Sequence, residues 1–365
     1  MFKQYKQDAE LSADSESQET KTLGFEEPPP PANYEAPPKP KGTIDPYPDF
    51  TESHIEEEAQ SMRDAMKGLG TDELTLIQVL TRHNNEQRQQ IRKTYKTMFG
   101  RDLLDDLMDE TSGSFKDTIK ALMMPSRLYD AWCIRRAMED LGTDEIRIID
   151  ILCPRTNEEI IMIREGYKEL YPKRDLENDL KDETSGDFKF LLVSIVQANR
   201  DSAEDVDEVI VTQDATELYK AGEGKVGTDE EVFNRILARR SWPHIKAVSA
   251  QYKKRYGMTL SASIKGEFSG HIKAGLLAIV SYAEDAIMYF AERVHNIKGS
   301  DDSILRFLVA HSETDLYEIK QRYHLVYKQS LEHMIASTES GDFAKLLIKI
   351  LNPNIDNSVL HKMVK

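Results

Sequence analysis

The sequence predicts an all-α protein made of four repeats of about 72 residues, with five helices each, behind a proline-rich N-terminal segment. Three observations support this fold class. One pattern recurs four times along the chain, breaker residues divide its first copy into five helical stretches, and no comparable run alternates apolar and polar residues as a strand does. A unit this small cannot bury a robust core alone, so we expect the four repeats to pack into one curved body.

The composition restricts the classes of partner. The chain carries 48 lysines and arginines against 64 aspartates and glutamates, a formal charge of −16. This charge argues against direct binding to nucleic acid or to an acidic membrane unless a cation bridges the two. Cys133 and Cys153 are too few for a disulfide framework, so we expect both to be buried in a protein of a reducing compartment.

No targeting or membrane-spanning segment is expected. The N-terminus lacks the apolar stretch of a signal peptide, and no run approaches the roughly 18 apolar residues of a transmembrane helix. These features favour a cytoplasmic protein.

Residues 1–50 differ from the rest of the chain. They hold 9 of its 14 prolines and carry 10 acidic side chains against 5 lysines. The stretch 28–41 is typical of an extended, polyproline-like segment. Two interpretations stay open: a flexible spacer, or a docking segment for a proline-reading domain, for which Pro37 and Pro40 form a minimal motif.

The repeats are placed by their shared residues. The aligned tyrosines Tyr95, Tyr167, Tyr252 and Tyr323 are spaced by 72, 85 and 71 residues. The longer middle interval contains an acidic stretch that we interpret as a surface connector. The predicted divisions are therefore an acidic proline-rich tail at 1–50, repeats at 51–124 and 125–198, the connector at 199–208, a third repeat at 209–282, and the fourth repeat with the C-terminal end at 283–365.

Breakers define the helices of the first repeat in order. Glycines, polar caps and Pro125 predict helices at 52–67, 71–82, 86–99, 102–109 and 113–124. In the third of these, the apolar residues Ile91, Tyr95, Met98 and Phe99 follow helical spacing. After the second helix, Arg82, Arg155 and Arg240 recur in three repeats, with His311 in the fourth. This repetition predicts a structural role in tying helices together.

A glycine-rich loop between the first two helices has the chemistry of a calcium site. Gly68 and Gly70 allow a tight turn whose carbonyls converge, and Glu110 follows Gly70 by forty residues. Carbonyl and carboxylate oxygens with water suit Ca²⁺. The alternative is a glycine-rich helix end without a ligand. The recurrence of the pattern in the third repeat, with Glu267 forty residues after Gly227, favours the calcium site.

These motifs closely resemble the annexin family. The phrases MKGLGTDE, GRDLLDDL, PSRLYDAW, LVSIVQANRD and KVGTDEE carry the resemblance, which covers about residues 52–352. It implies a curved, disc-like all-α fold and calcium-dependent binding to acidic phospholipid. It also implies sites on the convex face, with the N-terminal region on the opposite face. No HExxH, GxSxG, CxxC, Walker or EF-hand motif is present, so we expect no enzyme.

The resemblance implies specific calcium ligands. In the first repeat they are the carbonyls of Met66, Gly68 and Gly70 and the carboxylate of Glu110, with the Thr71 carbonyl and Glu73 at a weaker accessory site. In the third repeat they are the carbonyls around Gly224, Lys225 and Gly227 and the carboxylate of Glu267.

Two repeats depart from the family pattern. In the second, the residues concerned are Met138, Asp140, Gly142 and Glu183, where Asp140 replaces a glycine and the acid lies forty-one residues after Gly142. In the fourth, the first glycine is lost, leaving Gly299 as the loop candidate and Glu339 as the acid candidate, and either Glu339 or Thr338 meets the loop. We therefore expect the first and third loops to bind calcium better than the second, and the fourth least.

The loop chemistry predicts how the protein meets a membrane. One carboxylate neutralises only part of the charge of Ca²⁺, so lipid phosphate can complete the shell and calcium bridges two acidic partners. Leu69, Leu141 and Val226 occupy the loop tips, where they either pack locally or contact lipid. Other interpretations stay open: a helical scaffold that binds a protein through the proline-rich tail, an oligomer, and export to the cell surface without a signal peptide.

Overall fold

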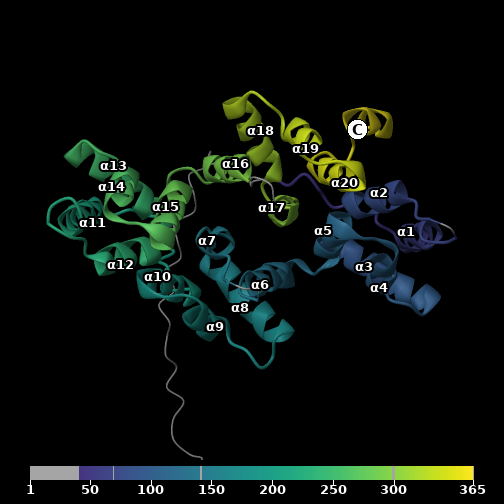
Figure 1. Ribbon diagram of the computed structural model, residues 1–365, viewed down its shortest axis with the longest axis horizontal. Helices are drawn as coiled ribbons and strands as arrows, with labels where there is room; N and C mark the ends of the chain where they lie inside the picture. Colours follow the sequence, from purple (N-terminus) through teal and green to yellow (C-terminus); the bar gives the residue numbers. More distant parts are fainter. Residues whose placement is uncertain (1–40, 69, 140–141, 298–300, 365) are drawn as a thin grey trace, which may run out of the picture. The chain divides into compact units, whose positions relative to one another are not determined.

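Regular structure in the described residues is entirely helical (Figure 1). The computed structural model describes residues 41–68, 70–139, 142–297 and 301–364, all within one unit, Pro40–Lys365. The predicted all-α class with four five-helix repeats is confirmed in these residues. No helix among them is both long enough and apolar enough to span a bilayer.

Five helices form each repeat, and a short helix follows the last one. The first repeat contains α1 (Glu52–Ala65), α2 (Glu73–Arg82), α3 (Asn85–Phe99), α4 (Leu103–Glu110) and α5 (Gly113–Met123). The second contains α6 (Ser126–Ala137), α7 (Glu145–Leu152), α8 (Asn157–Leu170), α9 (Leu176–Glu183) and α10 (Gly186–Val196). The third contains α11 (Glu208–Ala221), α12 (Glu230–Arg239), α13 (Trp242–Tyr256), α14 (Leu260–Glu267) and α15 (Gly270–Glu284). The fourth contains α16 (Ala286–Asn296), α17 (Asp301–His311), α18 (Leu316–Tyr327), α19 (Leu331–Thr338) and α20 (Gly341–Leu351), and α21 (Asn357–Met363) follows.

Helix caps explain small differences from the predicted bounds. α2 begins at Glu73 because the Asp72 side chain accepts a hydrogen bond from the Thr75 N–H and so acts as the N-cap. α3 ends where Gly100 adopts a left-handed conformation with φ of 71°. Of the apolar residues on α3, Ile91 and Tyr95 are buried, whereas Met98 is 40% exposed.

The third helix of each repeat buries one tyrosine at the centre of that repeat. Tyr95, Tyr167, Tyr252 and Tyr323 are all at most 1% exposed. Three of their hydroxyls reach the following helix, where Tyr95 donates to Asp106, Tyr167 to Asp179 and Tyr252 to Ser263. In the fourth repeat the hydroxyl of Tyr323 instead pairs with His295 of α16.

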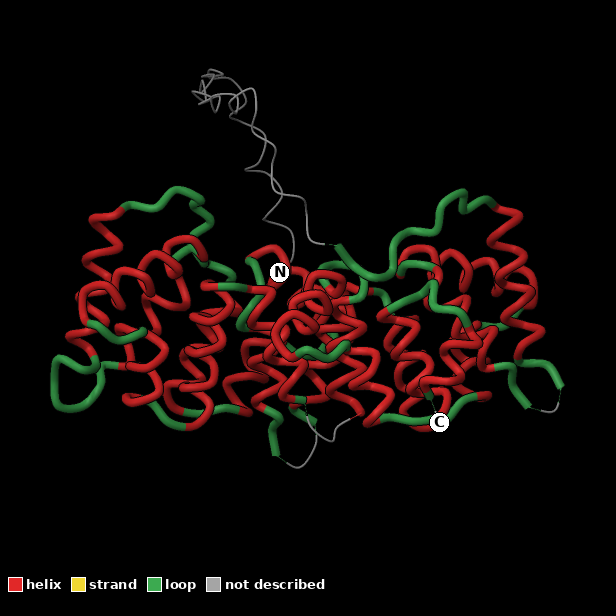
Figure 2. The backbone as a smooth tube through the Cα atoms, turned by 90° about the horizontal axis from the view of Figure 1, so that it is seen from above, coloured by secondary structure: helices red, strands yellow, loops and turns green. Residues whose placement is uncertain are grey.

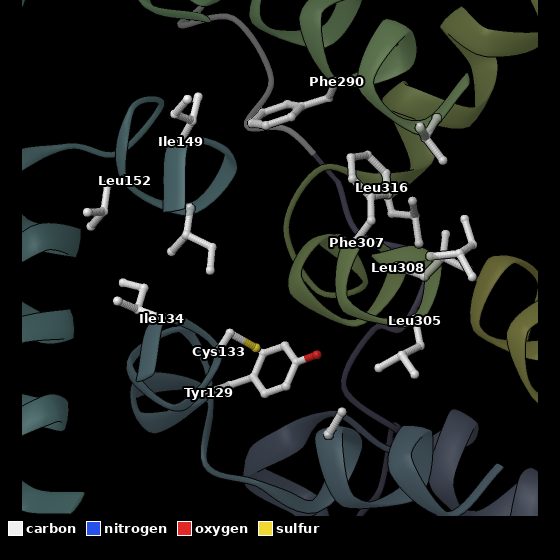
Figure 3. Packing of buried hydrophobic residues seen from close by; sticks show 14 of the residues in the cluster. Tyr129, Cys133, Ile134, Ile149, Leu152, Phe290, Leu305, Phe307, Leu308 and Leu316 are labelled. Atoms are coloured by element: carbon white, nitrogen blue, oxygen red, sulfur yellow. The ribbon is translucent and has the colours of Figure 1, made fainter. Parts of the chain in front are cut away.

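The repeats pack against one another in two pairs. In the first and fourth repeats, α2 contacts α20 and α5 contacts α17, whereas in the second and third, α7 contacts α15 and α10 contacts α12. α6 also contacts α17, and Figure 3 shows Tyr129 and Cys133 of α6 lying across from Leu305 and Phe307 of α17. Cys133 and Cys153 are buried free thiols, as expected from the sequence.

The described unit begins before residue 50, so the predicted tail boundary is placed too far along the chain. Ile44 is only 2% exposed. The N–H groups of Thr43 and Ile44 both donate to the Ser312 carbonyl, and the Thr43 hydroxyl donates to the Ile350 carbonyl. Residues 41–50 therefore pack against the fourth repeat. The rest of the predicted tail, 1–40 with its proline motif, lies outside the described residues.

The recurring arginine position is also shifted by one residue in the first repeat. Arg155 and Arg240 stand directly before the N-caps Thr156 and Ser241, and they bind Asp130 of α6 and Asp214 of α11. The residue before the N-cap Asn84 is His83, not Arg82. The helix-tying role is therefore filled by arginine in the middle repeats and by histidine in the first.

A close approach between α6 and α8 requires glycine at position 166. A Cβ atom there would lie 2.5 Å from the Arg127 carbonyl oxygen. We predict that Gly166→Ala destabilises the protein by about 1–3 kcal/mol, because backbone has to move to accept the methyl group. Chemical denaturation without divalent cations measures this change in the free energy of unfolding.

Gly266→Ala on α14 is the matched control. Its Cβ would meet nothing closer than 3.7 Å. Helix propensity then raises stability by up to about 1 kcal/mol. Equal effects of the two substitutions would contradict the packing argument.

Candidate functional site

The loop between the first two helices of a repeat is closed by the same hydrogen bond in three repeats. The backbone N–H of Asp72 donates to Ala65, that of Asp144 to Ala137, and that of Asp229 to Ala221, at 2.7–2.9 Å. Each bond joins the start of the second helix to the end of the first, so the residues between them project as a loop.

Glycine is required where these loops turn back. Gly70, Gly142 and Gly227 have φ of 92°, 92° and 82°, which side chains rarely adopt. Each is followed by threonine and the aspartate that closes the loop. The sequence Gly-Thr-Asp therefore has the same left-handed glycine in all three loops.

The predicted acids lie beside these loops. Glu110, Glu183 and Glu267 are the last residues of α4, α9 and α14. The loop threonine donates to the acid in each case: Thr71 to Glu110 at 3.4 Å, Thr143 to Glu183 at 3.1 Å, and Thr228 to Glu267 at 2.6 Å. The structure thus brings loop and carboxylate together in three repeats.

The extra residue of the second repeat does not separate its acid from its loop. It is accommodated in the turn between α8 and α9, and α9 still ends at Glu183. The register difference expected from the sequence therefore has no effect on this pair. Asp140, the other departure in this loop, lies outside the described residues, as do Leu141 of the same loop and Leu69 of the first loop.

The loop of the third repeat is described throughout. Gly222 lies so close to Glu267 that a Cβ atom would be 3.1 Å from the Cγ atom of that acid. Val226 at the tip is fully exposed, and the Lys225 ammonium lies 3.9 Å from Asp229. A carboxylate that the sequence analysis missed, Glu223, lies beside Gly266 and so close to Glu267. This loop is one residue longer than those of the first and second repeats, and that extra length was the sequence feature that could have pointed to Glu223.

The fourth repeat lacks an acid at the equivalent position. α19 has the same length as α4, α9 and α14, but it ends at Thr338, and Glu339 is its C-cap. Thr338 therefore replaces Glu110, and the candidate acid Glu339 lies one residue further along. Gly299 of this loop lies outside the described residues.

The remaining candidates lie at the ends of α1, α2 and α6. Met66 and Met138 are buried C-caps, so only their backbone is available as a ligand. Glu73 begins α2 and lines a surface hollow of about 400 Å³ with Glu110, Glu339 and Asp342. The Asp72 and Asp144 side chains cap their helices and are already hydrogen-bonded.

This donor set fits a hard cation. Loop carbonyls and the carboxylates beside them supply only oxygen, and each acid accepts a hydrogen bond from a threonine hydroxyl. The α1–α2 and α11–α12 loops also lie along one side of the helical unit, at the lower right and lower left of Figure 2. Ions bound in both loops would therefore face the same way.

Comparison with known proteins agrees with this geometry. A family model described as Annexin matches residues 57–122, 129–195, 213–279 and 289–350. Human annexin A7 is 43% identical over 315 residues, covering 85% of this chain and 64% of that protein, so the chain spans less than two thirds of that relative. Annexin A5 of Cynops pyrrhogaster is 46% identical over 312 residues, covering 84% of this chain and 95% of that protein.

Solved structures show the same similarity. Annexin III superposes with a TM-score of 0.82 at 38% identity, covering 85% of this chain and 97% of that one. A calcium-bound annexin (Sm)1 has a TM-score of 0.75 at 30% identity, covering 86% of this chain and 93% of that one.

We expect that Glu110 contributes little to folding. It is exposed and accepts a long, 3.4 Å hydrogen bond from the Thr71 hydroxyl. We predict that Glu110→Gln changes the free energy of unfolding by less than about 0.5 kcal/mol in the absence of divalent cations. Urea denaturation at neutral pH measures this value.

Asp106→Asn, one turn earlier on α4, is the control. Asp106 is 4% exposed and binds Arg101, Arg63 and Tyr95. The hydrogen bond from Arg101 keeps the pKa of Asp106 below its usual range despite burial. Its stabilisation is thus complete above about pH 4 and is lost as pH falls through the lower folded pKa. We expect a loss of about 1–3 kcal/mol at neutral pH, and a smaller loss in acid. Equal stability of the two variants would contradict this distinction.

Proposed function

The chain belongs to the annexin family, and from this premise we propose that it binds acidic phospholipid membranes when calcium is present. Annexins in general are calcium-dependent, peripheral membrane-binding proteins and not enzymes. The observation that carries the proposal is the pairing of a closed glycine loop with the carboxylate that ends the fourth helix, in three repeats.

In this proposal each loop holds one Ca²⁺. In the first repeat the carbonyls of Met66, Gly68 and Gly70 and the carboxylate of Glu110 are ligands, and Glu267 has the same role in the third. A single carboxylate leaves the bound ion with net positive charge, so the intrinsic dissociation constant is about 10⁻⁴–10⁻³ M. Lipid phosphate then replaces water in the shell. This bridging explains how a chain of charge −16 attaches to an acidic surface.

Several weak sites act together. Loops that face the same way engage one membrane simultaneously, so the combined affinity exceeds that of any single site. We rank the first and third loops above the second, where Asp140 replaces a glycine, and the fourth last. Thr338 at the position of the acid supports the last place of the fourth repeat.

The proposal includes a location and a role. Peripheral attachment to cytoplasmic membrane surfaces, with a part in membrane organisation or trafficking, follows from family membership. The alternative is a helical scaffold that binds a protein partner through the proline-rich segment. Sedimentation with acidic liposomes separates the two, because only the first function requires calcium and lipid.

Substitution of the acids tests the ligand assignment. We predict that Glu110→Gln and Glu267→Gln each raise the calcium concentration needed for half-maximal sedimentation several-fold, because a charged ligand is lost. Glu339→Gln is the matched control and leaves the midpoint unchanged. A Glu339→Gln shift as large as that of Glu110→Gln would show that the fourth repeat contributes a site after all.

Val226 tests the contact between loop tip and lipid. We expect Val226→Ser to weaken binding at saturating calcium by about 1 kcal/mol, or about fivefold, because an exposed apolar side chain no longer enters the interface. Val209→Ser is the control. Val209 is also exposed, at 65%, but it lies at the other end of α11, about 20 Å away. If both substitutions weakened lipid binding equally, the effect would come from a more polar surface in general and not from contact between Val226 and lipid.

A further inference from the structure

A second group of potential metal ligands lies at the far ends of α1 and α2. His54 and Glu58 are one turn apart in the first half of α1, and His83 directly follows α2. The glycine loop joins the opposite ends of these helices. Since α1 has 14 residues, the group lies about 20 Å from that loop.

The three potential ligand atoms converge on one point. The Nε2 atoms of His54 and His83 are 3.1 Å apart. The Glu58 Oε1 atom lies 3.4 Å from the first and 3.8 Å from the second. In a tetrahedral zinc site with bonds of about 2.0–2.1 Å, neighbouring ligand atoms are about 3.3–3.4 Å apart. The observed separations bracket this value without any movement of the backbone.

His83 is held ready to act as a ligand. Its Nδ1 atom lies 2.8 Å from the Val79 carbonyl oxygen, which can only accept, so Nδ1 carries the proton. The lone pair of Nε2 therefore points at His54 and Glu58. Such a second hydrogen bond is what orients metal-binding histidines in general.

The group is enclosed by the segment before α1. The Tyr47 ring stacks on His54 with centroids 4.5 Å apart, and the Phe50 ring lies 5.3 Å from His83. Two hydrogen bonds hold the segment in place. The Tyr47 N–H donates to the side-chain oxygen of Gln87, and the side-chain amide nitrogen of Gln87 donates to the Tyr47 carbonyl. The His83 side chain is fully buried and that of Glu58 is 10% exposed. A bound ion would thus be shielded from water.

The two middle repeats have an arginine at the position of His83. Arg155 binds Asp130 and Arg240 binds Asp214, so a guanidinium neutralises the acid on the first helix. In the first repeat His83 occupies this position, so no guanidinium is supplied from it. The nearest arginine, Arg82, is half exposed and 3.9 Å from Glu58. Burial accordingly raises the pKa of Glu58, although His54 and Arg82 oppose the rise.

We propose that His54, Glu58 and His83 form a binding site for one transition-metal ion of the zinc class. A set of two imidazole nitrogens and one carboxylate oxygen suits zinc, whereas calcium binds through oxygen ligands alone. The dication replaces the guanidinium of the two middle repeats and ties α1 to the residue that follows α2. The site is independent of the calcium loops and of the function proposed for them.

The test is titration of the full-length chain with Zn²⁺ by calorimetry in saturating Ca²⁺, which occupies the oxygen sites. We expect one equivalent to bind to the wild type. His83→Arg restores the guanidinium of the middle repeats, so it keeps the fold while affinity falls at least about 100-fold. Glu58→Gln and His54→Gln lose binding in the same way. His333→Gln, at an exposed histidine, is the control and binds as the wild type does.

Co²⁺ gives a second readout that does not depend on stability. We expect the visible absorption of four-coordinate Co²⁺ in the wild type and in His333→Gln, and none in His83→Arg or His54→Gln. The proposal is wrong if the wild type binds no Zn²⁺ in calcium. It is equally wrong if His83→Arg and His54→Gln keep the wild-type stoichiometry and affinity.

Discussion

In the first three repeats, the buried tyrosine on the third helix fixes the position of the helix that follows. In the first repeat its hydroxyl binds Asp106, which also binds Arg63 of α1, so α4 is held against both neighbours. In the second repeat Tyr167, Asp179 and Arg135 repeat the arrangement. Because the fourth helix is short, fixing its middle fixes its last residue, and that residue is the acid beside the glycine loop.

The fourth repeat shows the consequence of losing this contact. The position equivalent to Asp106 is occupied by Met334, and Tyr323 pairs with His295 instead. α19 keeps its length but ends at Thr338, so no carboxylate occupies the place of Glu110. The repeat still packs fully against the first one through α17 and α20. The fourth repeat therefore keeps the core packing of the other repeats and differs from them at the C-terminal end of α19.

The two ends of α1 and α2 have different chemistry. At one end, glycine carbonyls and an exposed carboxylate offer oxygen ligands in a loop. At the other, two imidazoles and a buried carboxylate lie beneath Tyr47 and Phe50. The two proposals would thus place an exposed site for a hard cation at one end of this helix pair and a shielded site for a softer ion at the other. His83, at the arginine position of the middle repeats, contributes to the difference together with His54 and Glu58.

Local patterns determined most of the fold and of the candidate site. The all-α class, the four repeats and the pairing of glycine loops with acids follow from helical periodicity and from spacings within one repeat, which short-range sterics control. Contacts between distant segments decided the rest. Residues 41–50 belong to the packed unit because Thr43 and Ile44 bind the Ser312 carbonyl of the fourth repeat. The aligned tyrosines already place His83, which precedes Tyr95 by twelve residues as Arg155 and Arg240 precede Tyr167 and Tyr252. The approach of His83 to His54 and Glu58 required the tertiary structure, because the packing of α2 against α1 brings these residues together.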